Sequence, residues 1–298
     1  MSHLSEAMKE GRFTVTAEVT PPCGPDPQRI RAVGSVLEGK VHALVVEENI
    51  DGVHMSSLVA GVHLKSIGVD PVVTMLTRDT NRIGLQSWLL GACSLEIGDV
   101  LVLSGHHQVL TAESHARGVY DVDSIQAIGI FRSMRDEGVL ACGQKMEMPV
   151  SIAIGGAANP FAGPIELRAL RVEKKVKAGA DFIITQPVFD LSRFREWLDL
   201  LGERGVPERA CLIAGIMWLK SADEARNLSE TYRGMSIPEG VIRRLSDAAD
   251  GEREGLLIAA EMVEEVRSLS GVRGIHLWAR EREESLPELL DSARLSIS

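Results

Sequence analysis

The chain has 298 residues, a length that suits either two domains of about 150 residues or one α/β barrel of about 250. Hydrophobic residues make up 45% and charged residues 25% of the chain, and this balance excludes a disordered chain, a collagen-like fibre and a coiled coil. The 42 acidic residues outnumber the 32 basic ones, which gives a formal net charge of -10. A field of that sign repels phosphate backbones and anionic lipids, so we expect neither nucleic acid nor a membrane as a partner.

The amino terminus and the cysteines indicate the compartment. No apolar run approaches the ~20 residues that span a bilayer, and residues 1–10 lack the apolar centre of a secretory signal. The four cysteines lie far apart and form no Cys-x-x-Cys pair, which supports neither a zinc site nor a disulfide framework. We therefore expect a reduced, cytoplasmic protein.

Short apolar runs rich in β-branched residues alternate along the chain with stretches of helical spacing. The expected strands are Phe13–Val19, Val41–Val46, Pro71–Met75, Asp99–Leu103, Pro149–Ile154, Asp181–Ile184, Cys211–Ile216 and Gly274–Trp278. The expected helices are Pro27–Leu37, Ser56–Ile67, Asn81–Leu95, Ser124–Glu137, Pro164–Ala178, Leu191–Gly202 and Ser221–Tyr232.

This alternation predicts an α/β fold, a (β/α)8 TIM barrel, because strands that are apolar on consecutive residues suit a parallel sheet buried on both faces. The stretch Pro238–Leu269 reads as two extra helices before the last strand, and the final helix is expected at Leu286–Leu295. No linker or composition break divides the chain, so residues 1–298 are expected to form a single domain. An open doubly wound sheet stays as the alternative, because a strand count from one sequence can err by one.

In a barrel of this kind the chemistry gathers at the carboxyl ends of the strands. Glu18 ends the first strand, just before Pro21 and Pro22. A carboxyl facing the barrel mouth would lose hydration, which raises its pKa and suits it to proton donation. An outward-facing glutamate fits the same position equally well. After the third strand, Asp79 or Thr80 can cap the next helix.

The loop after the fourth strand carries Gly105, His106 and His107, with His115 a few residues on. Adjacent side chains of an extended segment point in opposite directions, and no nearby carboxylate offers a further ligand, so we expect no metal site. Gly105 suits a close approach of the backbone to a cofactor.

Two further segments could bind a ligand. The helix after the fifth strand is locally basic, and its residues 168, 171 and 175 fall on one face, where they could neutralise a diphosphate or simply face solvent. Gln186 ends the sixth strand, where its donor and acceptor suit either the edge of a heterocycle or a backbone contact. No Gly-x-Gly-x-x-Gly turn, phosphate-binding loop or Gly-x-Ser-x-Gly elbow is present.

Four segments together resemble one known family. They are Ala17–Pro22, Leu76–Arg82, Leu85–Ala92 and Gly179–Gln186. Their combination resembles the methylenetetrahydrofolate reductase family in its short bacterial form, which consists of the catalytic domain alone. The resemblance runs from about residue 12 to residue 282.

The resemblance implies a barrel that holds FAD and reduces 5,10-methylenetetrahydrofolate to 5-methyltetrahydrofolate, with NADH or NADPH as electron donor. This reaction belongs to one-carbon metabolism and methionine biosynthesis. By the same resemblance Glu18 is the proton donor and Gln186 binds the pterin, while Glu224 and Arg282 contact the folate substrate. The residues implied around the flavin are Gly105, His106, Asn159, Arg171, Lys174 and Lys175.

The sequence departs from the family pattern at several of these positions. His106 stands where the family has an aspartate that tunes the flavin, Met75 replaces a histidine, and Glu224 replaces a glutamine. The first departure leaves an alternative open, namely a flavin-free methyltransferase that binds folate or another pterin, or a subunit of the same fold that works only with a partner. A homo-oligomer, or a partner protein for redox or methyl transfer, also stays open.

Overall fold

The computed structural model describes residues 1–232, 235–280 and 282–297, and its eight strands close into a barrel. Each strand pairs in parallel with the next along the chain, and the last pairs with the first. The (β/α)8 prediction is therefore confirmed. The strands are β1 (Thr14–Val19), β2 (Ala43–Val46), β3 (Pro71–Leu76), β4 (Asp99–Leu103), β5 (Ala153–Ala158), β6 (Phe182–Pro187), β7 (Cys211–Met217) and β8 (Val272–Trp278).

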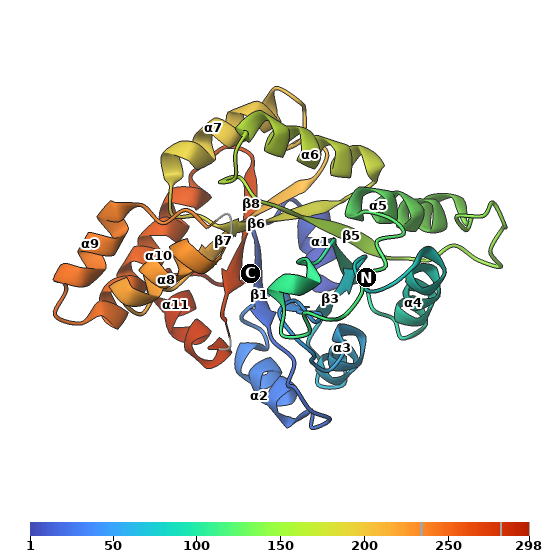
Figure 1. Cartoon of the computed structure of the whole chain (residues 1–298), viewed down its shortest axis with the longest axis horizontal. Coiled ribbons are helices and arrows are strands. Elements are labelled where there is room, and N and C mark those ends of the chain that lie inside the picture. The colour runs from blue at the N-terminus through green and yellow to red at the C-terminus, as the bar shows by residue number, and fades with distance from the viewer. Residues whose placement is uncertain (233–234, 281, 298) are drawn as a thin grey trace.

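Helices surround the barrel on all sides, as Figure 1 shows. The stretch before β8 contains two helices beyond the one that follows β7, as the spacing predicts. A π-helical turn, Ser133–Glu137, extends the fifth helix. The helices of the ring are α2 (Gln28–Leu37), α3 (Ser57–Lys65), α4 (Arg82–Ser94), α5 (Ser124–Arg132), α6 (Ile165–Ala178), α7 (Leu191–Gly202), α8 (Ala222–Thr231), α9 (Glu239–Asp247), α10 (Gly251–Arg267) and α11 (Leu286–Ser292).

One further helix, α1 (His3–Lys9), was not expected from the sequence. It lies behind the barrel in Figure 1, at the amino ends of the strands. Its Leu4 is fully buried in a cluster with interior residues of the barrel that include Leu101 and Phe182. The Ser5 hydroxyl donates a hydrogen bond of 2.9 Å to the buried carboxylate of Asp99. This helix therefore closes the amino end of the barrel.

The alternation of side chains along β1 decides which residues reach the barrel interior. Val15, Ala17 and Val19 belong to the core cluster shared with the surrounding helices. The intervening Thr16 contacts the interior His276, with 3.0 Å between the hydroxyl and Nδ1, and Glu18 lies on the same side of the strand. Because successive side chains of a strand face opposite sides, the carboxyl of Glu18 points inward.

The prediction for the fifth strand was wrong by four residues, since the expected Pro149–Ile154 is found at Ala153–Ala158. The discrepancy arises from Gly155 and Gly156, which have poor strand propensity. Gly155 is required there for another reason, because a Cβ atom at this position would lie 2.2 Å from the ring of Phe182. The neighbouring strand thus fills the space that a side chain would otherwise occupy.

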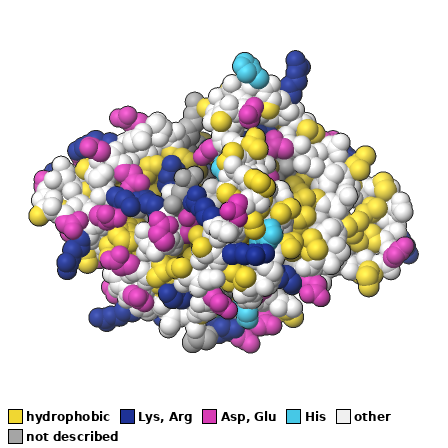
Figure 2. Space-filling model, turned by 90° about the horizontal axis from the view of Figure 1, so that it is seen from below, with side chains coloured by type: hydrophobic (Ala, Val, Ile, Leu, Met, Phe, Trp, Pro, Cys, Tyr) yellow, Lys and Arg dark blue, Asp and Glu magenta, His cyan; other side chains and the backbone are white. Residues whose placement is uncertain are grey.

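Charged and hydrophobic side chains are unevenly distributed over the outer surface. Figure 2 shows charged side chains concentrated on one side of the view from below and hydrophobic ones on the other. Large exposed hydrophobic side chains include Ile83 and Leu90 on α4 and Met148 before β5. No helix in the described ranges is long and apolar enough to cross a bilayer.

Candidate functional site

A cavity of about 420 Å³ opens at the carboxyl ends of the strands. It brings together side chains from distant parts of the sequence, as expected for the catalytic end of a barrel. A second hollow of about 290 Å³ adjoins it, and Glu18, Glu47, Tyr232 and Trp278 line both. Seven of the predicted site residues line the larger cavity, namely Glu18, Gly105, His106, Asn159, Arg171, Lys175 and Gln186.

Glu18 lines one wall of this cavity, which we call the acidic wall because Glu47 lies on it as well. The residue surface of Glu18 is only 3% exposed. Its Oε1 accepts hydrogen bonds from the backbone N–H groups of Ala279 and Arg280, both at 2.8 Å. Burial raises the pKa of Glu18 well above its usual value, the nearby Glu47 carboxyl raises it further, and the two backbone bonds oppose the shift. The inward-facing alternative is therefore the observed one, and this carboxyl can hold a proton.

Glu47 was not among the predicted site residues, but it also lines the cavity, and the sequence carries a signal for it. Val45 of β2 faces the barrel interior beside Glu18, and Glu47 follows it by two residues on the same side. Burial raises the pKa of Glu47 as well, and a hydrogen bond from the Thr20 hydroxyl opposes this shift. Two carboxyl groups with raised pKa values therefore share one wall.

The opposite wall is basic and comes from β5 and α6. Lys175 is buried, donates a hydrogen bond to the carbonyl of Ala157, and has its pKa lowered to about 8 by burial and by the positive charge of Arg171. The Nε of Arg168 is buried without a hydrogen-bond partner among the described residues. Lys174, by contrast, is exposed and does not line the cavity, because it points away from the face that carries Lys175.

Two amide side chains also line the cavity. The Oε1 of Gln186 is buried and accepts no hydrogen bond from any described residue, so it offers a free acceptor to a ligand. The Oδ1 of Asn159 instead accepts the N–H groups of Phe161 and Ala162, at 2.9 and 3.2 Å, and thereby shapes the turn after β5. Gln186 is the amide that still needs a partner.

His106 lies at the cavity rim, with 3.2 Å between its Nδ1 and Oδ1 of Asp51. Its ring meets Tyr232 edge-on, with 5.9 Å between the ring centroids. Gly105 before it has a positive φ of 81°, and a Cβ there would lie 3.1 Å from Cβ of Arg78. Glycine is therefore needed where the β4 loop crosses the β3 loop.

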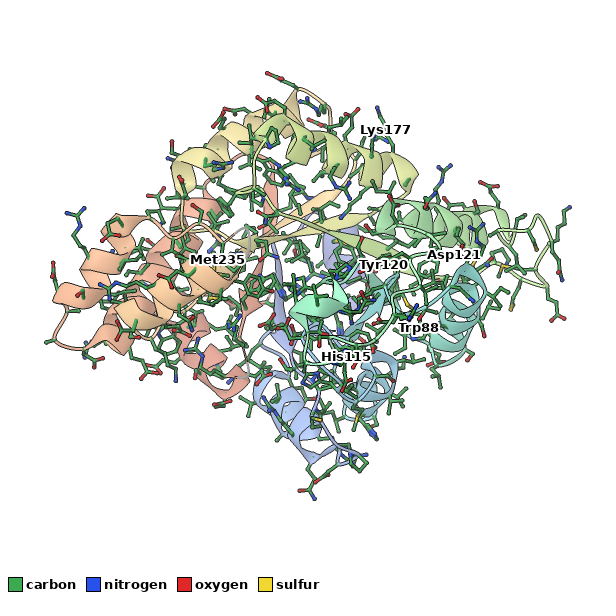
Figure 3. All side chains as sticks on the ribbon, in the orientation of Figure 1. Trp88, His115, Tyr120, Asp121, Lys177 and Met235 are labelled. Atoms are coloured by element: carbon green, nitrogen blue, oxygen red, sulfur yellow. The ribbon has the colours of Figure 1, made fainter. Side chains whose placement is uncertain are left out.

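The other two histidines of this loop have different surroundings. His107 stacks on Tyr120, with 6.5 Å between ring centroids, and its Nδ1 accepts the N–H of Val109. Figure 3 shows His115 and Tyr120 on segments that cross the front of the barrel. Within the described ranges, no group of three or more His, Cys, Asp or Glu side chains could hold a metal ion.

Arg78 is a second residue that was not among the predicted site residues. Its guanidinium is buried and donates to the carboxylate of Asp79 and to three backbone carbonyls, those of Asn49, Ile50 and His106. It therefore joins the loops after β2, β3 and β4. Asp79 serves this arginine and does not cap α4.

The cap of α4 and the remaining predicted contacts lie elsewhere. Asn81 caps the helix by accepting the N–H groups at its start. Glu224 and Arg282 form an ion pair of 3.0 Å, and Arg282 also donates to the carbonyl of Trp218. Neither Glu224 nor Arg282 lines the cavity. The structure thus pairs these two side chains with each other, outside the group that surrounds Glu18.

Comparisons with known proteins agree with this architecture. Residues 3–294 match the family model described as methylenetetrahydrofolate reductase. The chain is 24% identical over 255 residues to a probable methylenetetrahydrofolate reductase (NADPH) of Caenorhabditis elegans, a match that covers 83% of this chain and 36% of that protein. It is 27% identical over 121 residues to methylenetetrahydrofolate reductase 1 of Schizosaccharomyces pombe, covering 39% of this chain and 19% of the other.

Among solved structures, an uncharacterized protein from Clostridium thermocellum that binds two copies of 5-methyl-5,6,7,8-tetrahydrofolic acid has a TM-score of 0.68. That match covers 98% of both chains at 13% identity and shows a shared fold. The chain thus spans about a third or less of the curated relatives named above, but nearly all of this structural neighbour.

Proposed function

Because this chain belongs to the methylenetetrahydrofolate reductase family, we propose that it reduces 5,10-methylenetetrahydrofolate to 5-methyltetrahydrofolate with a bound flavin. One observation carries the proposal. A buried carboxyl able to hold a proton, Glu18, and an unpartnered amide oxygen, that of Gln186, line one cavity at the carboxyl ends of the strands. A reduced pterin needs both a proton donor and an acceptor for its N–H edge.

In this reaction Glu18 donates its proton to the substrate nitrogen whose bond to the one-carbon bridge must break. The carboxylate that remains keeps two backbone hydrogen bonds, from Ala279 and Arg280, which stabilise its negative charge. Gln186 holds the pterin ring in place through its free oxygen. The carbon exposed by the opened bridge then accepts a hydride.

The basic wall fits the diphosphate of a flavin nucleotide. Arg168 has an unused buried Nε, and Arg171 and Lys175 line the same cavity, so three cations meet there in a protein of net charge -10. FAD, when bound, would supply the hydride, with NADH or NADPH as its source. Lys174 is exposed, and its proposed contact with the cofactor is therefore less direct than that of Lys175. Gly105 and His106 would approach the ring system from the β4 loop, with Asn159 shaping the loop after β5.

The proposed substrate class has one further support. The Clostridium thermocellum protein of the same fold binds 5-methyltetrahydrofolate, which is the product of the proposed reaction. We extend this to a role in one-carbon metabolism and methionine biosynthesis in the cytoplasm. Glu224 and Arg282 would contribute only to the outer part of such a substrate, since they lie outside the cavity lining.

A second candidate is a flavin-free methyltransferase, or a partner-dependent subunit, that keeps the folate pocket. His106 favours it, because an imidazole occupies the position where the family has a carboxylate. The Asp51 carboxylate beside His106 returns a negative charge to the same rim, which is why we rank the reductase first.

The experiment is an anaerobic assay of the purified protein with methylenetetrahydrofolate, FAD and NADH or NADPH, preceded by a visible absorption spectrum. We expect a flavin spectrum, formation of methyltetrahydrofolate, and a loss of ~100-fold or more in Glu18→Gln with flavin affinity kept. Absence of any affinity for FAD would overturn flavin-dependent reduction. Methyl transfer without flavin, or activity that appears only with a co-purified protein, would establish the second candidate instead.

A further inference from the structure

The two carboxyl groups of the acidic wall are placed by strand register. Glu18 of β1 pairs with Val45 of β2, so Thr20 comes opposite Glu47 two residues further along both strands. The backbone confirms this continuation, since the N–H of Glu47 donates to the carbonyl of Val19 at 3.1 Å. Glu18 and Glu47 therefore face the barrel interior on neighbouring strands, one layer apart, and both line the two adjoining hollows.

Hydrogen bonds that involve Thr20 and Glu283 fix the position of the Glu47 carboxyl group. The Thr20 hydroxyl donates to Oε2 of Glu47, while its N–H donates to Oε1 of Glu283 at 2.9 Å. Glu283 is buried and is anchored by Arg29 of α2, with 3.2 Å between Nη2 and Oε2. Glu47 is thus fixed beside Glu18 and cannot turn away without losing the Thr20 bond.

The groups that face Glu18 from the surrounding elements leave its negative charge poorly compensated. The β2 loop contributes Glu47, Asp51 and His54, and the end of α8 contributes Tyr232. The segment from β8 onward contributes His276, Arg280 and Glu283, and burial lowers the pKa of His276 to about 3, so this ring is neutral. The guanidinium of Arg280 lies over the Tyr232 ring, 5.5 Å from its centroid, while the backbone N–H of Arg280 donates to Glu18.

We propose that Glu18 and Glu47 hold one proton between them, with Glu47 as a positioning residue whose negative charge keeps that proton on Glu18 in the resting protein. Two carboxyl groups in one low-dielectric site cannot both ionise without strong repulsion, so the pair titrates as a unit. This inference rests on the proposed function, because it assigns Glu47 a part in the same proton transfer.

The proton balance is simple. Glu18 gives its proton to the substrate nitrogen, an O–H bond breaks and an N–H bond forms, and Glu18 becomes a carboxylate held by Ala279 and Arg280. The repulsion between the resulting carboxylates favours the forward transfer and, after product leaves, the uptake of one proton from solvent. Glu47 itself makes and breaks no bond with substrate.

The first test is the pH dependence of kcat/KM. Activity that requires protonated Glu18 falls as pH rises through the pKa of the pair. In Glu47→Gln the repulsion is gone, so we expect the midpoint of this fall to move down by about one pH unit or more. Thr20→Val should move it in the same direction, because Glu47 without the Thr20 bond competes better for the shared proton. An unshifted midpoint in Glu47→Gln would overturn the proposal.

Glu48→Gln is the matched control. It removes the same charge one residue further along, but the Glu48 carboxylate faces the other way, where it accepts the N–H of Ser57 at 2.7 Å and the amide of Asn49. Neither hollow is lined by Glu48. We expect its pH profile to match that of the unaltered protein. A shift as large as that of Glu47→Gln would mean that general charge, and not the pair, sets the midpoint.

A second measurement needs no turnover. Infrared difference spectra of the protein without substrate, recorded against pH, follow the C=O stretch of protonated carboxyl groups. We expect a band that persists to neutral pH, disappears in Glu18→Gln, and titrates at lower pH in Glu47→Gln than in Glu48→Gln. If the band behaves as expected in these variants while no folate is reduced, the shared proton is supported and the proposed function fails. If folate is reduced but neither the band nor the profile moves, the pair fails alone.

Discussion

Glu18 should lower the stability of the folded protein as pH rises. Burial raises the pKa of this carboxyl in the folded state, so between its unfolded and folded pKa values the folded chain binds more protons than the unfolded one. Stability therefore falls as pH rises through that window. Gln at this position keeps an oxygen that accepts the Ala279 and Arg280 bonds and carries no charge. We expect Glu18→Gln to raise the thermal midpoint more at pH 8 than at pH 5, as measured by calorimetry.

The opposite result would contradict a protonated Glu18. A variant that is less stable than the unaltered protein at pH 8 would show that the carboxylate is the favoured form in the fold. Because this measurement uses no ligand, it is independent of the proposed reaction.

Lys175 should make anion binding depend on pH. Its pKa of about 8 means that the ammonium loses its proton as pH rises through about 8, unless a bound anion holds it. We expect the affinity for inorganic pyrophosphate, measured by calorimetric titration, to fall above this pH and to drop about tenfold in Lys175→Met, the loss of one charge-assisted contact. Lys174→Met is the control, because that side chain is exposed outside the cavity. An equal loss in both variants would place the anion outside the cavity.

At the scale of elements, the mouth of the barrel depends on the contacts between loops. The loops after β2, β3 and β4 meet at the guanidinium of Arg78. We expect Arg78→Ala to lower the free energy of unfolding by about 2–3 kcal/mol, since it leaves buried carbonyl groups without donors. Hydrogen exchange should rise at residues 49–51 and 105–107 in particular. Arg82→Ala is the comparison, because the ion pair of Arg82 with Asp121 is on the surface and should matter little.

Hydrogen exchange that stays unchanged at both loops in Arg78→Ala would show that Arg78 does not hold them. Exchange that rises over the whole chain would instead indicate a global loss of the fold, and the milder Arg78→Lys would then separate the two effects.

The elements differ in how far their sequences reveal them. The fourth strand is found at its predicted bounds, Asp99–Leu103, because four consecutive apolar residues follow Asp99 and polar loop residues come directly after them. The fifth strand was misplaced because contact with Phe182 requires Gly155, and a single sequence does not show tertiary contacts. Helix α1 was missed because its stability comes from the packing of Leu4 into the barrel, and not from the intrinsic helix propensity of a seven-residue segment.

The residues of the candidate site likewise divide into those that the sequence reveals and those that it does not. A carboxyl at the end of β1 and an amide at the end of β6 could be predicted, since the ends of parallel strands meet at one face. Strand alternation decides the direction in which Glu18 points. This rule can be applied only when another residue of the same strand is known to face the barrel interior. The role of Arg78 depends on loops that the barrel brings together, and that of Glu47 depends on the register between β1 and β2. The same closure paired Glu224 with Arg282, which no local pattern indicates.

At the scale of the whole molecule, the barrel separates the residues of its two ends. The carboxyl end holds the cavity with an acidic wall from β1 and β2 and a basic wall from β5 and α6. The amino end holds apolar packing around α1 and one buried acid, Asp99, whose pKa burial raises to about 6. Charged groups that cost stability are thus concentrated where a ligand would pair with them, while the other end is closed by hydrophobic contacts.

This separation predicts that stability and ligand binding respond to different substitutions. Leu4 is fully buried beneath the barrel, in one cluster with Val72, Leu101 and Phe182. We expect Leu4→Ala to lower the free energy of unfolding by about 2–5 kcal/mol, the usual range for a buried leucine truncated to alanine. The affinity for pyrophosphate and the pH profile of Glu18 should stay unchanged, as measured on the folded variant below its thermal midpoint. Ile83→Ala, at a 74% exposed residue, is the control. A Leu4→Ala protein that is folded but binds ligand more weakly would show that packing at the amino end also sets the geometry of the cavity.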